Sequence, residues 1–174
     1  LPKQINVQNC QILPPTREIK VEKQNSKKFL IGIFVRPIRY SKSLFECIRD
    51  LIKFGTIDGV VFSHPSLNDD KSKSFLLDLL ARNGISSDVC EIASGDMSID
   101  AGKVGAVLDS FPIGSPTTTR DLLFANVPVF VFEGTDVFSK LSSSFLSSCS
   151  MTDFLWHDVN ELNQKIQSFR DKKS

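Results

Sequence analysis

The sequence lacks the patterns that mark several common classes of protein. Neither charge sign is in excess, because 21 Lys and Arg residues face 20 Asp and Glu, so composition does not point to nucleic acid or an anionic membrane as partner. The longest apolar runs, such as residues 127–132, are too short to cross a bilayer, and the N-terminus has no apolar signal-peptide core. A soluble protein without a membrane span is therefore expected.

Cysteine is sparse and scattered. The four cysteines include no Cys-x-x-Cys pair and no histidine at ligand spacing, so neither a zinc site nor a disulfide framework is predicted. No Asp-x-Asp motif is present to hold a metal-bound diphosphate, and we expect neither a metal nor a cofactor. A reducing, cytoplasmic location fits these thiols best. The residues are Cys10, Cys47, Cys90 and Cys149.

Two nucleotide-binding fingerprints are also missing. The segment 34–42, which follows the first predicted strand, contains neither the G-x-G-x-x-G of dinucleotide-binding domains nor the G-x-x-x-x-G-K-[ST] of P-loop proteins. It also lacks the aspartates of a phosphoacceptor domain. A flavodoxin-like domain is disfavoured because its phosphate loop should follow this strand.

The chain is long enough for one domain, and its pattern changes near residue 28. Residues 1–27 contain Pro2, Pro14 and Pro15 without sustained periodicity, which predicts a linker or extended arm. Residues 28–174 alternate short β-branched or aromatic runs with helical stretches, which predicts an α/β fold: a Rossmann-like parallel sheet flanked by helices. Strands are expected near residues 29–35, 58–63, 88–93, 104–109 and 127–132.

Helices are expected between these strands because apolar residues recur at spacings of three and four. Gly55 and Gly84 stand where two helices should end. The serine-rich segment 139–150 has a helical apolar spacing and predicts a small-residue helix packed on the sheet. The core-facing stripes are Leu44, Phe45, Ile48, Leu51 and Ile52, then Phe75, Leu76, Leu79 and Leu80, and finally Val159, Leu162, Ile166 and Phe169.

The segment after the fourth predicted strand is the most informative about function. Ser115 can cap a helix that has Pro116 at its first position, which leaves the amides of Thr117 and Thr118 at the positive end of the helix dipole. Such an end binds phosphate, and Asp121, one turn later, could accept hydrogen bonds from a ribose. The alternative is an ordinary helix start in which Thr118 and Asp121 form a capping box.

This segment resembles a known family. The run Leu108-Asp-Ser-Phe-Pro-Ile-Gly114, the Thr117-Thr118 pair, Asp121, Val127-Pro128 and Glu133-Gly134 are similar to the C-terminal donor-binding domain of the protein O-linked N-acetylglucosamine transferases. They also resemble the bacterial adhesin N-glycosyltransferases. The resemblance covers about residue 28 to the C-terminus, and implies the C-terminal half of a two-domain GT-B glycosyltransferase cut from a larger enzyme.

The resemblance implies a UDP-sugar donor, with GlcNAc or glucose transferred to a protein or glycan acceptor. Thr117 and Thr118 would contact the diphosphate and Asp121 the ribose, with Gly114 and Ser115 leading into the helix. Lys42 is the nearest match to a diphosphate-binding lysine, although a solvated charge opening a helix explains it equally well. The acceptor site and the catalytic base would lie largely on an N-terminal domain.

Two departures from that family leave an alternative open. Pro116 stands where the O-linked enzymes have histidine, and residues 94–100 contain none of the Lys, His and Arg that hold the nucleotide there. A catalytically silent glycosyltransferase-like partner or scaffold module would explain both departures. His64 and His157 are interpreted as structural or surface residues.

Overall fold

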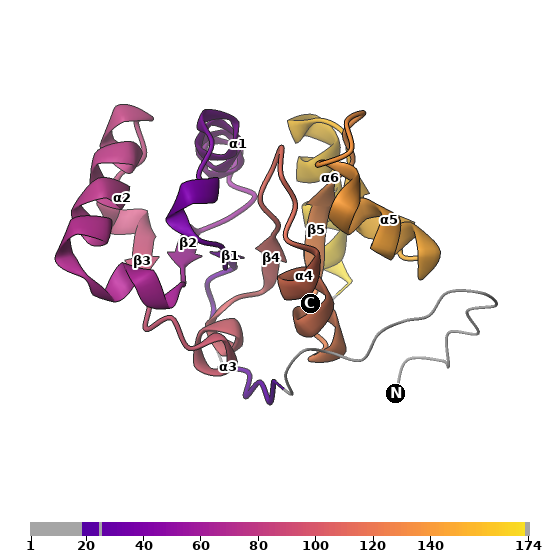
Figure 1. The fold of residues 1–174 in the computed structure, drawn as a ribbon, viewed down its shortest axis with the longest axis horizontal. Coiled ribbons are helices and arrows are strands. Elements are labelled where there is room, and N and C mark those ends of the chain that lie inside the picture. Colours follow the sequence, from indigo (N-terminus) through magenta and orange to yellow (C-terminus); the bar gives the residue numbers. More distant parts are fainter. Residues whose placement is uncertain (1–18, 25, 173–174) are drawn as a thin grey trace.

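In the computed structural model, residues 19–24 and 26–172 are described, and they form an open parallel sheet with helices on both faces (Figure 1). The strand order is β3-β2-β1-β4-β5-β6, and every neighbouring pair is parallel. The strands are β1 (Leu30–Ile33), β2 (Gly59–Phe62), β3 (Cys90–Ile92), β4 (Ala106–Leu108), β5 (Val129–Phe132) and β6 (Leu155–Trp156). The order reverses direction between β1 and β4, as in Rossmann-type domains, so the expected fold class is confirmed.

Six α-helices and five short 3-10 helices lie between or after the strands in the described part of the chain. The α-helices are α1 (Lys42–Lys53), α2 (Asp70–Arg82), α3 (Met97–Asp100), α4 (Pro116–Phe124), α5 (Lys140–Ser148) and α6 (Val159–Asp171). The 3-10 helices are η1 (Pro37–Arg39), η2 (Pro65–Asn68), η3 (Ser87–Val89), η4 (Ala101–Lys103) and η5 (Thr152–Phe154).

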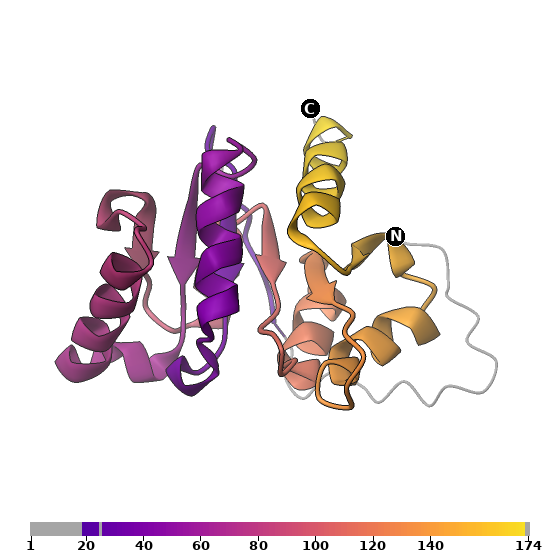
Figure 2. The same cartoon turned by 90° about the horizontal axis from the view of Figure 1, so that it is seen from above.

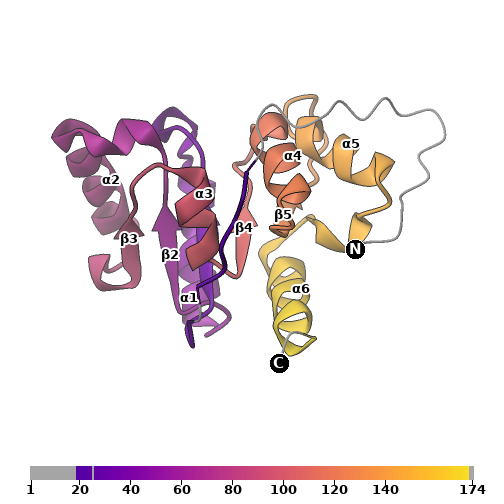
Figure 3. The ribbon, with the colours of Figure 1, turned by 90° about the horizontal axis from the view of Figure 1, so that it is seen from below.

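Five of the six strands send alternate side chains into two hydrophobic cores, because successive residues of a strand face opposite sides of the sheet, whereas β3 packs only on the first core. Val60 and Phe62 join the core under α1, α2 and α6, whereas Val61 joins the core under α3, α4 and α5. The same division holds for Leu108 and Val107 of β4. Figure 2 shows α1 and α6 on one face, and Figure 3 shows α3 and α4 on the other.

The helix boundaries follow local sequence signals. Ser41 and Asp69 cap α1 and α2 by accepting hydrogen bonds from Leu44 N and Ser72 N. Gly55 and Gly84 follow the ends of the same helices with φ of 68° and 69°, a left-handed conformation that glycine adopts without strain. The two glycine stops were expected from the sequence.

The serine-rich segment forms α5, as predicted. Ser142 and Ser143 are buried, and α5 packs on α4 and β5. Side chains this small let the helix approach its neighbours closely. The segment is therefore part of the folded domain.

The predicted arm is described only in part. Residues 1–18 and 25 lie outside the described residues. Within 19–24, Gln24 N donates to Gly102 O at 3.0 Å and Lys23 Nζ donates to Val104 O at 3.2 Å. This stretch therefore lies against η4 at the start of β4.

Candidate nucleotide site at the β1 and β4 loops

The site expected from the sequence lies where the strand order reverses. The loops that follow β1, β4 and β5 emerge along one edge of the sheet, which Figure 2 shows at the bottom of the view. Ligands of open parallel sheets bind beyond the carboxyl ends of the strands at such a reversal. The structure thus places the Leu108–Gly114 motif in the position where this architecture holds its ligands.

The loop after β4 is held by a buried carboxylate. Asp109 is 3% exposed; its Oδ1 accepts from Ser110 N at 2.8 Å, and its two oxygens accept from Ser115 N at 3.1 and 3.0 Å. Burial raises the pKa of Asp109, while the nearby hydroxyls of Ser142 and Thr119 and the amides of Ser115 and Ser110 act in the opposite direction. The carboxylate therefore fixes the path of the chain into α4.

The loop after β1 is tied to the loop after β4 by an arginine. Arg39 Nη1 donates to the carbonyl oxygen of Gly114 and to Ser115 Oγ, the latter at 3.0 Å. Ser41 Oγ donates to Phe111 O at 2.7 Å. These contacts join the two loops on either side of the reversal and place a guanidinium beside the start of α4.

The start of α4 agrees with the sequence prediction in position and differs in detail. Ser115 occupies the N-cap position and Pro116 the first turn, as expected, but the Ser115 hydroxyl caps no amide of the helix. Its Oγ lies 3.2 Å from Ser110 Oγ and accepts from Arg39. Among the described residues, no acceptor is within hydrogen-bond reach of the Thr117 and Thr118 amides, which stand at the positive end of the helix.

The capping box considered for this helix is wrong. Thr118 is the third residue of α4, so it cannot be the N-cap residue that such a box requires. Asp121 lies in the second turn and is 2% exposed, with Oδ1 3.7 Å from Arg120 Nε. In this conformation its carboxylate faces the interior of the protein.

The remaining expected residues fall in different surroundings. Thr117 is exposed and Thr118 half-buried, while Gly114 is buried against α5: a Cβ there would lie 2.7 Å from Ser142 Oγ. Lys42 begins α1 with a side chain that is 82% exposed, and pairs with Glu46 at 3.6 Å. The structure thus groups Gly114, Ser115 and the two threonines, and leaves Lys42 in solvent.

Sequence reasoning missed Arg39 and Asp109 as parts of this site. Asp109 stands inside the motif, and an ionisable residue directly after a buried strand is a signal that could have identified it. Arg39 carries no such signal, because its contacts with Gly114 and Ser115 depend on the adjacency of β1 and β4.

The two histidines occupy structural and surface positions, as interpreted. His64 Nδ1 accepts from Ser66 N at 3.1 Å, and burial, followed by the charge of Arg36, lowers its pKa. His157 Nδ1 lies 3.0 Å from Glu161 Oε2 on the exposed start of α6. Within the described part of the chain, no three His, Cys, Asp or Glu side chains gather where they would hold a metal ion.

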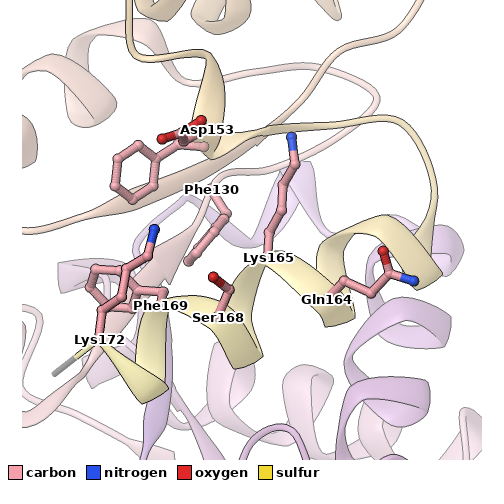
Figure 4. A pocket seen from close by; sticks show the side chains of 8 residues that line it. Phe130, Asp153, Gln164, Lys165, Ser168, Phe169 and Lys172 are labelled. Atoms are coloured by element: carbon pink, nitrogen blue, oxygen red, sulfur yellow. The ribbon is translucent and has the colours of Figure 1, made fainter. Parts of the chain in front are cut away.

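A hollow of about 460 Å³ lies elsewhere, between α6 and the segment that precedes β6 (Figure 4). Its lining combines three phenylalanines with a polar rim, and includes none of the residues expected to bind a nucleotide. Its residues are Phe130, Phe154 and Phe169, with Asp153, Gln164, Lys165, Ser168 and Lys172.

Across residues 19–24 and 26–172, no helix is long and apolar enough to cross a membrane.

Comparison with known proteins shows the fold. No family model matches the sequence, and no curated protein matches it. Among solved structures, the chain is similar to the Thermobaculum terrenum O-GlcNAc transferase mutant K341M, with a TM-score of 0.74 and 18% identity. The match covers 90% of this chain and 31% of the transferase chain, so this domain has the fold of about a third of that protein.

Proposed function

We propose that this domain binds the nucleotide-sugar donor of a glycosyltransferase, with UDP held at the start of α4. The observation that carries the proposal is the pair of uncapped amides of Thr117 and Thr118 at the strand-order reversal, in a domain that shares its fold with part of an O-GlcNAc transferase. A helix start of this kind attracts phosphate through its amides and its dipole. We also propose that a complete enzyme containing this domain transfers the sugar from UDP to an acceptor.

The roles follow from exposure and charge. The amides and hydroxyls of Thr117 and Thr118 would bind the diphosphate, beside the chain that enters α4 through Gly114 and Ser115. Arg39 adds positive charge at the same place, whereas Lys42 could take part only by moving from its pair with Glu46. Stabilising the diphosphate in this way would favour its departure during transfer.

The sugar, the acceptor and the rest of the enzyme are proposed from the sequence resemblance and the fold match. The motif resembles enzymes that transfer GlcNAc or glucose from UDP, so either sugar would be carried to a protein or glycan acceptor. An N-terminal domain is proposed to supply the acceptor site. The match covers 31% of the transferase chain that shares this fold, so most of that chain has no counterpart in this domain. Binding needs no metal in this scheme, since amides, hydroxyls and a guanidinium would neutralise the diphosphate.

Calorimetry with UDP and one matched pair of variants tests the proposal. Thr117→Val removes a hydroxyl and keeps the amide, so binding should weaken by about 0.5–1.5 kcal/mol, the net worth of a neutral hydrogen bond. Thr152→Val is the control, because Thr152 is an exposed threonine at the start of η5, outside the site. The control should bind UDP as the wild type does.

A silent module is the second candidate. Residues 94–100 contain no cationic side chain. Asp100 within them is fully buried and accepts hydrogen bonds from Ser63 and Gly95. The same calorimetry decides between the two functions. A folded wild-type chain that releases no heat with UDP beyond dilution would favour the silent module and contradict donor binding.

A further inference from the structure

Asp109 is a buried ionisable residue that takes no part in the proposed contacts with UDP. A carboxylate that is 3% exposed must be matched by donors, because burying an unpaired charge is very unfavourable. Its backbone donors are the amides of Ser110 and Ser115, at the two ends of the loop that leads from β4 to α4. Asp109 thus closes this loop on itself.

Two hydroxyls from other elements complete the surroundings of this carboxylate. Thr119 of α4 and Ser142 of α5 are buried beside it, close enough for their hydroxyls to lower its pKa, although neither hydroxyl makes a hydrogen bond of normal geometry with the residues described. Gly114 passes so close that a Cβ would lie 3.2 Å from Asp109 Oδ2 and 2.7 Å from Ser142 Oγ. The loop, α4 and α5 therefore meet around one carboxylate.

These contacts also determine which groups are free in the first turn of α4. Ser115 is held through its amide by Asp109 and through its hydroxyl by Arg39 and Ser110, so the hydroxyl is not available to cap the helix. An N-cap serine otherwise accepts from an amide of the first turn. Holding Ser115 in this way leaves the amides of Thr117 and Thr118 open to a ligand.

We infer that Asp109 is a positioning residue of the donor site, which sets the start of α4 without touching the ligand. The inference rests on the proposed function, since it names the residue that orients the amides proposed to bind the diphosphate. Asp109 acts through Ser115, because loss of the carboxylate would free the Ser115 amide and loosen the chain where it enters α4.

Asp100 provides a matched control on the same face of the sheet, but on the other side of the strand-order reversal. It is 0% exposed, accepts from Ser63 Oγ at 2.6 Å and from Gly95 N at 2.9 Å, and lies 3.6 Å from Lys103 Nζ. It therefore joins the loops after β2 and β3 much as Asp109 joins the loop after β4 to α4. Asp100→Asn removes a comparable buried carboxylate and leaves α4 untouched.

The experiment compares Asp109→Asn with Asp100→Asn in the full chain, by UDP titration and by amide hydrogen exchange at a temperature where both are folded. For Asp109→Asn we expect UDP binding to weaken by about tenfold or more, which corresponds to about 1.4 kcal/mol. Exchange should also accelerate at the amides of Ser115 and Thr119. Asp100→Asn should leave UDP affinity and α4 exchange as in the wild type.

Gly114→Ala is the second variant, to be used if Asp109→Asn does not fold. It keeps the carboxylate but pushes the loop away from Asp109 and Ser142, so it should also weaken UDP binding. Unchanged affinity and exchange in the Asp109 or Gly114 variant would overturn the inference, as would equal losses in Asp100→Asn. If the wild type does not bind UDP, the proposed function fails, and the exchange rates alone then show whether Asp109 holds α4.

Discussion

Asp121 lies on the buried side of α4, although the sequence motif suggests a ribose contact for it. It is 2% exposed, and its Oδ1 lies 3.7 Å from Arg120 Nε. Because removing a buried, partnered carboxylate leaves polar groups behind, Asp121→Ala should lower the free energy of unfolding by about 1–3 kcal/mol. Denaturant melts measure this loss, and UDP titration of the same variant should show an affinity close to that of the wild type.

The opposite result would restore the ribose contact. If Asp121→Ala folds with wild-type stability but binds UDP about tenfold more weakly, the carboxylate must reach the ligand in the bound state. Thr152→Val again serves as the control for both measurements. The two readouts separate a packing role from a ligand contact in one protein.

Individual site residues were predictable only where their role is local. Pro116 and Ser115 take the helix positions that their side chains favour, and the amides of Thr117 and Thr118 follow from them. The use of the Ser115 hydroxyl was not predictable, because its partner Arg39 lies in another loop. No sequence pattern shows that the two loops meet until the strand order is known.

At the scale of elements, the start of α6 carries the clearest pH-dependent contact. Glu161 Oε1 lies 2.9 Å from Lys165 Nζ, and Oε2 accepts from His157 N at 2.8 Å. The hydrogen bond from Lys165, followed by those from His157, lowers the pKa of Glu161 from its ordinary value of 4.5 to about 2. Its stabilising effect is therefore present above pH 4.5 and is lost as the pH falls toward about 2.

Glu161→Gln tests this contact. Because the side chain is 31% exposed, we expect the substitution to lower the free energy of unfolding by no more than about 1 kcal/mol at pH 5 to 7. The difference between wild type and variant should shrink as the pH approaches 2, since the protonated carboxyl resembles the amide. Urea melts across this range measure the difference, and a difference independent of pH would contradict the assignment.

Elements with a strong repeating pattern were predictable, and short ones were not. The five strands expected from apolar runs are all present, although each is shorter than its predicted range. The sixth, β6, consists of Leu155–Trp156, too short for any alternation to be visible in the sequence. Helix α3 spans Met97–Asp100 and carries no repeat of its own. Both depend on packing against elements that are distant in sequence.

At the scale of the whole molecule, the match to the transferase covers 31% of that protein's chain. Sugar transfer requires an acceptor held against the donor in a site that excludes water, and this domain presents an open edge of its sheet. We therefore expect no transfer from UDP-GlcNAc or UDP-glucose to a protein acceptor by residues 1–174 alone. Measurable transfer by the purified chain would show that the site is complete within these residues.

UDP binding at the start of α4 can be followed directly by amide chemical shifts during a UDP titration of the wild-type chain. We expect saturable shifts at Thr117 and Thr118, with smaller ones at Ser115. Residues of the hollow beside α6, such as Lys165 and Ser168, should be unaffected. No shift at α4 at saturating UDP, or shifts confined to Lys165 and Ser168, would contradict it.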